Sequence, residues 1–172
     1  MDILGKSPIP LPLLILGKLA FAGCWLFFIV KFLAVDTMLY DSAATRAAGI
    51  ALFVCGAALA LLALVHLGRS AAVGIPDRMT ELKTHGVYSI SRNPVYLGAF
   101  LTCAGSCLFS IHPLNVLLCA IAIAIHHWIV KKEEHFLEER FGEQWREYCA
   151  RVPRYIRRPG NTEDAEKVDS RG

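Results

Sequence analysis

The chain has 172 residues, room for one domain, and 55% of them are hydrophobic, with a mean hydropathy of +0.44. This hydrophobic share exceeds that of ordinary soluble globular proteins and excludes that class. It predicts an all-α integral membrane protein. The formal net charge of +3 at pH 7 needs no nucleic-acid partner to explain it, because the basic residues gather in the loops and at the C-terminal end.

Four apolar runs, at about 11–35, 46–68, 94–111 and 113–130, each approach the ~20 residues with which a helix crosses ~30 Å of hydrocarbon. We therefore predict about four transmembrane helices within a single domain over 1–158. Only Ile111, His112 and Pro113 separate the last two runs, which predicts a tight helical hairpin. Lys18 and Lys31 interrupt the first run, and we expect their ammonium groups to reach water at opposite interfaces.

Small residues recur in the second and third runs at helical spacing. They are Gly49, Gly56 and Ala60 in one run, and Gly98, Thr102 and Gly105 in the other. Because such stripes let helix backbones approach closely in lipid, the pattern predicts close helix packing at these two runs.

Beyond Val130 the sequence becomes charged, with apolar residues at helical spacing among the charges. Those residues are Phe136, Leu137, Phe141, Trp145 and Tyr148. The pattern predicts a C-terminal cytoplasmic amphipathic helix that bends near Gly142 and stops at Val152 and Pro153. The tail over 159–172 lacks apolar residues to bury, and we predict that it is disordered.

The basic residues predict the orientation. Arg69, Arg78, Lys83 and Arg92 lie between the second and third runs, and ten more follow from Lys131 onward, whereas the 36–45 loop has Asp36 and Asp41 only. The positive-inside rule therefore places both termini and the 69–93 segment in the cytoplasm of a multi-pass protein.

Two polar motifs flank the last two apolar runs. The first comprises Gly86, Tyr88, Arg92, Asn93, Pro94, Tyr96 and Gly98. The second comprises Glu133, Glu134, Leu137, Phe141, Gly142, Trp145, Tyr148, Val152, Pro153 and Arg154. The region over 80–156 thereby resembles the isoprenylcysteine carboxyl methyltransferase family, whose relatives include the phospholipid N-methyltransferases.

The resemblance implies methyl transfer from S-adenosylmethionine to a lipophilic small molecule or lipid-modified substrate, at an active site that faces the cytoplasm. Membrane lipid is the other expected partner, and no metal is expected. The implied cofactor-binding residues are Lys83, His85, Gly86, Val87, Tyr88, Asn93, Tyr96, Leu97 and Glu133. An aromatic face attracts a sulfonium cation, which suits Tyr88 and Tyr96, although both also fit an interfacial aromatic belt.

The expected catalytic residues are Arg92, Asn93 and Glu133. A guanidinium at Arg92 would pair with the cofactor carboxylate, or else it anchors lipid phosphate. Most relatives have His in place of Asn93, which argues against a general base there. Glu133 lies seven residues after His126 and so nearly on the same helical face, whereas Glu134 is expected to be solvated.

The expected substrate-side residues are His126, Ile129 and Trp145. His126 near the end of an apolar run is a candidate proton acceptor, and a neutral hydrogen-bonded histidine is the alternative. In the eukaryotic prenylcysteine enzymes an Arg that contacts substrate stands at the position of Ile129, so we expect a prenylated cysteine to be a poor acceptor. Arg151 and Arg154 suit either the cofactor or anionic headgroups.

Three other functions compete with this interpretation. They are a phospholipid or amine N-methyltransferase, a sterol-reductase-like enzyme that uses NADPH, and a membrane scaffold without activity. The sterol reductases are longer than this chain. Five of the six cysteines fall within apolar runs, so we interpret Cys103 and Cys107 as small buried hydrophobic residues instead of metal ligands.

Overall fold

The computed structural model describes residues 10–33, 40–67 and 82–156. These ranges contain α1 (Leu11–Phe32), α2 (Ala43–Leu67), the short 3-10 helix η2 (Gly86–Ser89), α3 (Pro94–Phe109), α4 (Pro113–Phe141) and α5 (Glu143–Arg151). The only β pairing within the described ranges is an isolated bridge between Tyr40 and Ile111, which confirms the all-α fold. Residues 34 and 35 of the first apolar run, Arg69, Arg78 and the 159–172 tail lie outside the described residues.

Among the described residues, α1, α2 and α4 are long and apolar enough to cross a membrane. Their length and composition indicate an integral membrane protein. Helix α3 has 16 residues, which gives about 24 Å at 1.5 Å per residue and leaves it at the short end for a span.

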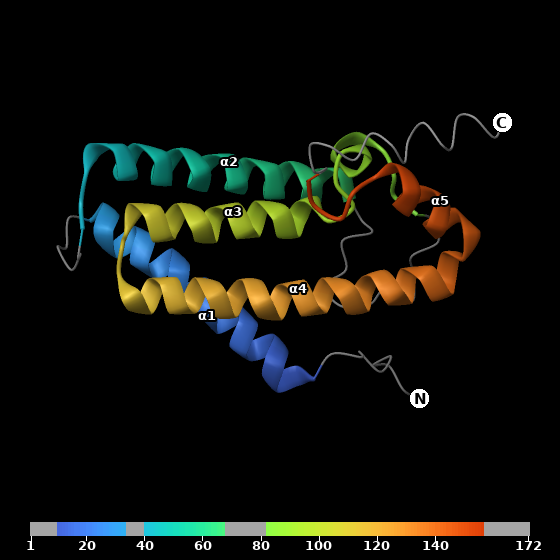
Figure 1. Cartoon of the computed structure of the whole chain (residues 1–172), viewed down its shortest axis with the longest axis horizontal. Helices are drawn as coiled ribbons and strands as arrows, with labels where there is room; N and C mark the ends of the chain where they lie inside the picture. Colours follow the sequence, from blue (N-terminus) through green and yellow to red (C-terminus); the bar gives the residue numbers. More distant parts are fainter. Residues whose placement is uncertain (1–9, 34–39, 68–81, 157–172) are drawn as a thin grey trace.

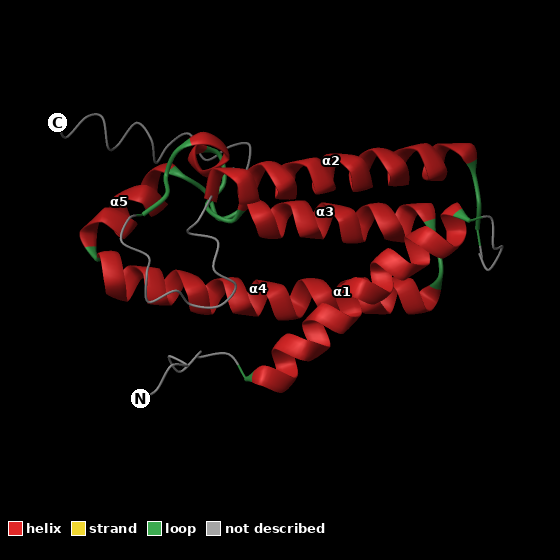
Figure 2. Cartoon of the chain, turned by 180° about the vertical axis from the view of Figure 1, so that it is seen from behind, coloured by secondary structure: helices red, strands yellow, loops and turns green. Residues whose placement is uncertain are grey.

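Helices α2 and α3 lie side by side along their length (Figure 1). A Cβ added to Gly98 would lie 2.5 Å from the Gly56 carbonyl oxygen, and one added to Gly105 would lie 2.5 Å from the Phe53 amide nitrogen. The glycines therefore permit backbone contact, and the packing predicted from the two small-residue stripes is confirmed. Helix α1 crosses α4 obliquely, as the view from behind also shows (Figure 2).

The interior where α1, α3 and α4 meet is made of small residues. Cys24, Cys103 and Cys119 pack there with Ala20 and Ala122, and all five are buried. The cysteines are free thiols, and they fill space as small hydrophobic residues, as the sequence predicts.

At one end of the bundle the turn between α3 and α4 meets the end of α1. The His112 side chain accepts a hydrogen bond from the Leu114 amide, and Pro113 occupies the first turn of α4, which confirms the predicted hairpin. The expectation that Lys31 reaches water is wrong, because its side chain is buried and its ammonium lies 3.1 Å from the Asp41 carboxylate. A carboxylate outside the span replaces water as the partner of this charge.

At the other end α4 runs on without interruption to Phe141. Gly142 has φ +51°, a left-handed conformation that favours glycine and ends the helix. Helix α5 then begins at Glu143 and ends at Arg151, before Val152 and Pro153. The bend and the stop are both as predicted, and they return the chain toward η2 and the start of α3 (Figure 1).

Candidate functional site

The Gly86 backbone lies in close contact with the His66 side chain. Its φ of +65° is left-handed, and a Cβ at this position would overlap the His66 imidazole at the end of α2. Glycine is therefore required both for the turn and for the contact with α2. His66 is exposed, and nothing in the sequence links it to the segment around Gly86.

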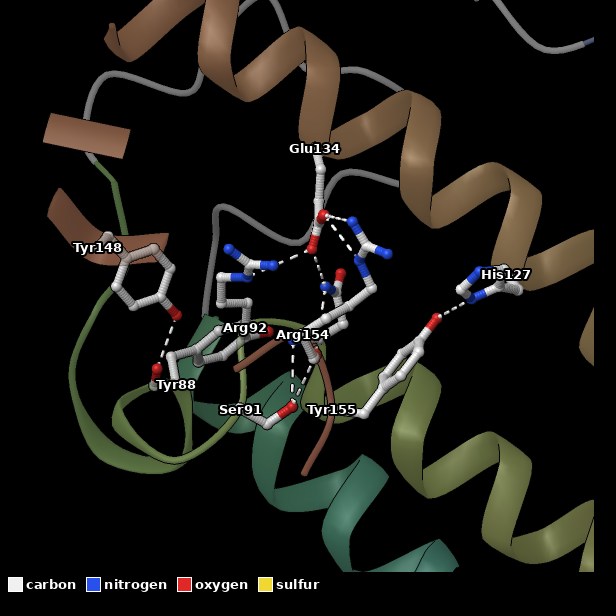
Figure 3. A network of polar contacts seen from close by, with 9 residues as sticks. Tyr88, Ser91, Arg92, His127, Glu134, Tyr148, Arg154 and Tyr155 are labelled. Atoms are coloured by element: carbon white, nitrogen blue, oxygen red, sulfur yellow. Dashed lines mark hydrogen bonds and ion pairs between the residues drawn. The ribbon is translucent and has the colours of Figure 1, made fainter. Parts of the chain in front are cut away.

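Backbone hydrogen bonds join the two motifs, which are about sixty residues apart in sequence. The Arg92 amide donates to the Pro153 carbonyl at 2.9 Å, and the Asn93 amide donates to the Arg154 carbonyl at 3.2 Å. The Tyr148 hydroxyl donates to the Tyr88 carbonyl at 2.6 Å. The segment after α5 is thus held against the residues that lead into α3 (Figure 3).

Glu134 is the centre of this junction. Only 7% of the residue is exposed, and its carboxylate accepts from Arg154 Nε at 2.8 Å and from Asn93 Nδ2 at 2.8 Å. Arg154 Nη2 lies 2.7 Å from the same carboxylate, so this pair has two contacts. Figure 3 shows the arginines converging on Glu134.

Arg92 also contacts Glu134, at a longer distance than Arg154 does. Its Nε lies 3.4 Å from Glu134 Oε1, an ion pair without hydrogen-bonded geometry, and its guanidinium lies over the Trp145 ring, 5.6 Å from the ring centre. The expectation that Glu134 is solvated is therefore wrong. The adjacent Lys131 and Lys132 suggested an exposed helix turn, whereas the partners of Glu134 come from segments distant in sequence.

A second cluster lies on the neighbouring face of α4. The Tyr96 hydroxyl donates to Glu133 Oε1 at 2.9 Å, and the Tyr96 ring centre lies 6.1 Å from that of His126. Glu133 and His126 therefore share a face of α4, as their spacing predicts, and Tyr96 from α3 contacts both.

The remaining candidate residues fall around this centre. Lys83 and His85 line a cavity of about 520 Å³ together with residues of α4 and α5. Leu97 lines a second, more apolar hollow of about 390 Å³ that Tyr155 also borders. Val87 is half-buried, and Tyr88 is buried. Ile129 and Trp145 are buried at 2% and 4% exposure, and the structure does not bring them into either hollow.

The tyrosines and Arg154 outside the helical spans have shifted acidities. Burial raises the pKa of Tyr88 to about 12, and burial also raises the pKa of Tyr148. The hydrogen bond to Glu134 raises the pKa of Arg154. Both phenols are therefore neutral at physiological pH, and the Tyr148 hydroxyl donates its hydrogen bond to the Tyr88 carbonyl, while Arg154 keeps its charge.

Sequence reasoning missed Tyr155. Its hydroxyl lies 3.0 Å from His127 Nδ1 on α4 (Figure 3), and its ring meets Phe100 on α3 at 5.4 Å between centres. It thus bridges two helices from the segment after α5. The residue follows directly after the second motif, and no spacing signal marks it.

Comparison with known proteins places this sequence in a family. The sequence model described as phospholipid methyltransferase matches residues 44–144. Protein-S-isoprenylcysteine O-methyltransferase B of Arabidopsis thaliana is 32% identical over 111 residues, which are 61% of this chain and 55% of that protein. The probable protein-S-isoprenylcysteine O-methyltransferase of Oryza sativa subsp. indica is 30% identical over 110 residues, 60% of this chain and 56% of that protein.

A third relative is the protein-S-isoprenylcysteine O-methyltransferase of Tribolium castaneum, 36% identical over 76 residues, 41% of this chain and 26% of that protein. The chain spans about half the length of the plant relatives that it matches. The resemblance inferred from the two motifs is confirmed, because the family match covers more than half of the residues. The chain belongs to the phospholipid methyltransferase family.

Proposed function

We propose that this chain transfers a methyl group from S-adenosylmethionine to a lipophilic acceptor at the membrane interface. The observation that carries the proposal is the cluster of Glu133, Tyr96 and His126 beside the joined motifs, in a chain of this family. The cluster lies at the end of the bundle where polar residues follow the apolar helices. An acceptor in the bilayer and a polar cofactor in water would both have access to that end.

The residues present fit such a methyl donor. When bound, S-adenosylmethionine supplies a methyl group on a cationic sulfonium. The cavity of about 520 Å³ that Lys83 and His85 line is within the usual size range of small-molecule sites, while Glu133 and Tyr96 lie outside its lining. We assign Glu133 to the cationic end of the donor, Tyr96 to its orientation, and the backbone at Gly86 and Val87 to close contact. Asn93 stays a proposed site residue, with its amide NH₂ held by Glu134.

Arg92 stays in the proposed site as a residue that positions others. Its guanidinium pairs with Glu134 and lies over the Trp145 ring. These contacts favour a role in holding the segment in place over direct pairing with the cofactor. We place the substrate-side residues His126, Ile129 and Trp145 in the same region, on α4 and α5.

Binding of S-adenosylhomocysteine tests the assignment. Glu133→Gln is expected to weaken binding by more than ten-fold, about 1.4 kcal/mol, because a neutral amide lacks the charge attraction to an ammonium or sulfonium group. Glu139→Gln is the matched control, since the Glu139 side chain is 66% exposed on the same helix. Calorimetry on purified protein measures both affinities.

Equal affinity of the two variants would refute the placement of Glu133. A parallel titration with NADPH separates the reductase hypothesis, which predicts that NADPH binds and S-adenosylhomocysteine does not. A scaffold without activity is expected to bind neither. Either result would overturn the proposed function as a whole.

We also propose four spans, with α3 as the third, and a cytoplasmic active site followed by the amphipathic helix α5. The basic residues of the 69–93 segment and of the region after Lys131 support this orientation. On a background in which the six native cysteines are replaced, an impermeant maleimide is expected to label Ala44→Cys only from the non-cytoplasmic side and Glu139→Cys only from the cytoplasmic side. Both positions are exposed. Labelling of Ala44→Cys from the cytoplasm would reverse the topology.

The identity of the methyl acceptor depends on which charged groups are available to bind it. The relatives are named for isoprenylcysteine, yet the position where those enzymes are expected to hold a carboxylate with Arg is the buried Ile129. Of the described arginines near the junction, Arg92 and Arg154 already face Glu134. These contacts favour the second candidate, N-methylation of an amine-bearing amphiphile, over methylation of a prenylated cysteine carboxylate.

A further inference from the structure

We propose that His126 is the proton acceptor of this site and that the acceptor substrate therefore brings a proton, as an ammonium headgroup does. The inference rests on the proposed methyl transfer and names the substrate class for it. A carboxylate acceptor arrives at neutral pH with its lone pairs free and needs no base, whereas an ammonium must first lose a proton.

The backbone fixes the tautomer of His126. Its Nδ1 lies 2.7 Å from the Ala122 carbonyl oxygen, and a carbonyl can only accept a hydrogen bond. In the neutral imidazole Nδ1 therefore carries the hydrogen, and the basic lone pair is on Nε2. Among the described residues no hydrogen bond to Nε2 of His126 is present.

The surroundings of the ring suit a base beside the proposed cofactor residues. Tyr96 from α3 contacts the ring and donates its hydroxyl to Glu133, so these are the titratable groups that face His126 from α3 and from α4. Helix α1 contributes Phe21, whose ring centre is 6.2 Å away, and Gly17. A Cβ on Gly17 would lie 3.3 Å from His126 Cε1.

Two charged residues belong to the surroundings of the ring, Lys18 on α1 and Glu133 on α4. Lys18, next to Gly17, is exposed and is the charged residue of α1 nearest in sequence to the contact. Glu133, on α4, lies across Tyr96 from the ring and accepts the hydrogen bond of the Tyr96 hydroxyl. The ring is half-buried, and its Nε2 has no hydrogen bond among the described residues, so this nitrogen is the one that could accept a proton.

The proposed step is a single proton transfer. The N–H bond of the acceptor ammonium breaks, its electron pair stays on nitrogen as a lone pair, and the proton bonds to Nε2 to give an imidazolium. The neutral amine is then the nucleophile for the methyl group. The imidazolium later returns its proton to water.

His127 provides the matched control. It is the next residue of the same helix, but its Nδ1 lies 3.0 Å from the Tyr155 hydroxyl, and Figure 3 shows it turned toward that residue. Its substitution removes an imidazole at the same depth without touching the ring beside Tyr96.

The test uses the full chain in nanodiscs, with phosphatidylethanolamine and N-acetyl farnesylcysteine as acceptor probes. His126→Gln is expected to lower turnover of the amine probe by at least a hundred-fold and to flatten its rise with pH, while His127→Gln leaves both nearly unchanged. ¹⁵N spectra of histidine-labelled protein, assigned with the two variants, are expected to show the Nδ1–H tautomer at His126 without any cofactor.

Three results would overturn the assignment while leaving methyl transfer intact. They are an Nε2–H tautomer at His126, equal turnover and pH profiles for the two variants, and turnover of the farnesylcysteine probe alone. If the wild-type chain methylates neither probe and binds no S-adenosylhomocysteine, the proposed function fails and the base fails with it. Binding measurements on wild type therefore distinguish the two failures.

Discussion

Gly98→Val is expected to destabilise the helical bundle by about 3 kcal/mol, because α2 and α3 are in backbone contact at this residue. A Cβ on Gly98 would lie 2.5 Å from the Gly56 carbonyl oxygen and 2.7 Å from the Ala60 amide nitrogen. Backbone atoms of a helix cannot move aside as a side chain does, so the two helices must separate. Reversible unfolding in mixed detergent micelles measures the change.

Gly23→Val is the control for this prediction. A Cβ there would approach only the end of the Leu118 side chain, at 2.8 Å from Cδ1, and that end can rotate away. We expect a change below about 1 kcal/mol, since repacking one flexible side chain costs little. Similar losses in the two variants would show that the α2–α3 contact is looser than the structure has it.

This contact was predictable because it depends on periodicity within two helices. Small residues at repeats of seven, such as Gly49 and Gly56 or Gly98 and Gly105, mark a face without any knowledge of the partner. The bend at Gly142 and the stop at Pro153 were predictable for the same reason, because they follow from local backbone preferences. The hairpin at His112 and Pro113 also belongs to this class.

The junction of the two motifs was only half predictable. The motif spacing identified Glu133, and helical periodicity placed it with His126, but neither indicated that Tyr96 would contact both. Glu134 was misjudged because its environment is tertiary. The pairing of Ser91–Asn93 with Pro153 and Arg154 buries this carboxylate, and no property of the Lys131–Glu134 stretch reveals that pairing.

Lys31 illustrates the same limit at the other end of the bundle. A lysine at the end of an apolar run ordinarily extends toward water. Here the chain returns through Asp41, which lies 3.1 Å from the ammonium and 3.0 Å from Arg46. Charge patterning along the sequence therefore predicts where charges lie in a membrane protein, but the contacts between them depend on how the loops fold back.

Glu134→Gln is expected to cost about 3 kcal/mol of folding free energy, because it leaves buried positive charge without its counter-ion. The Arg92 side chain is 11% exposed and the Arg154 side chain 36%, so Arg92 suffers the greater penalty and Arg154 can partly reach water. Glu139→Gln, on an exposed carboxylate that lies 3.3 Å from His135 Nε2, is expected to change stability by less than about 0.5 kcal/mol.

Unfolding of both variants in detergent measures these energies, and a double-mutant cycle with Arg154→Gln isolates the pair. We expect a coupling of at least about 1 kcal/mol between Glu134 and Arg154, because the two contacts at 2.8 and 2.7 Å are lost together. A Glu134→Gln variant as stable as Glu139→Gln would mean that the segment after α5 is not held at this junction. Asn93, whose amide donates to the same carboxylate at 2.8 Å, would then lose its fixed orientation beside the proposed site.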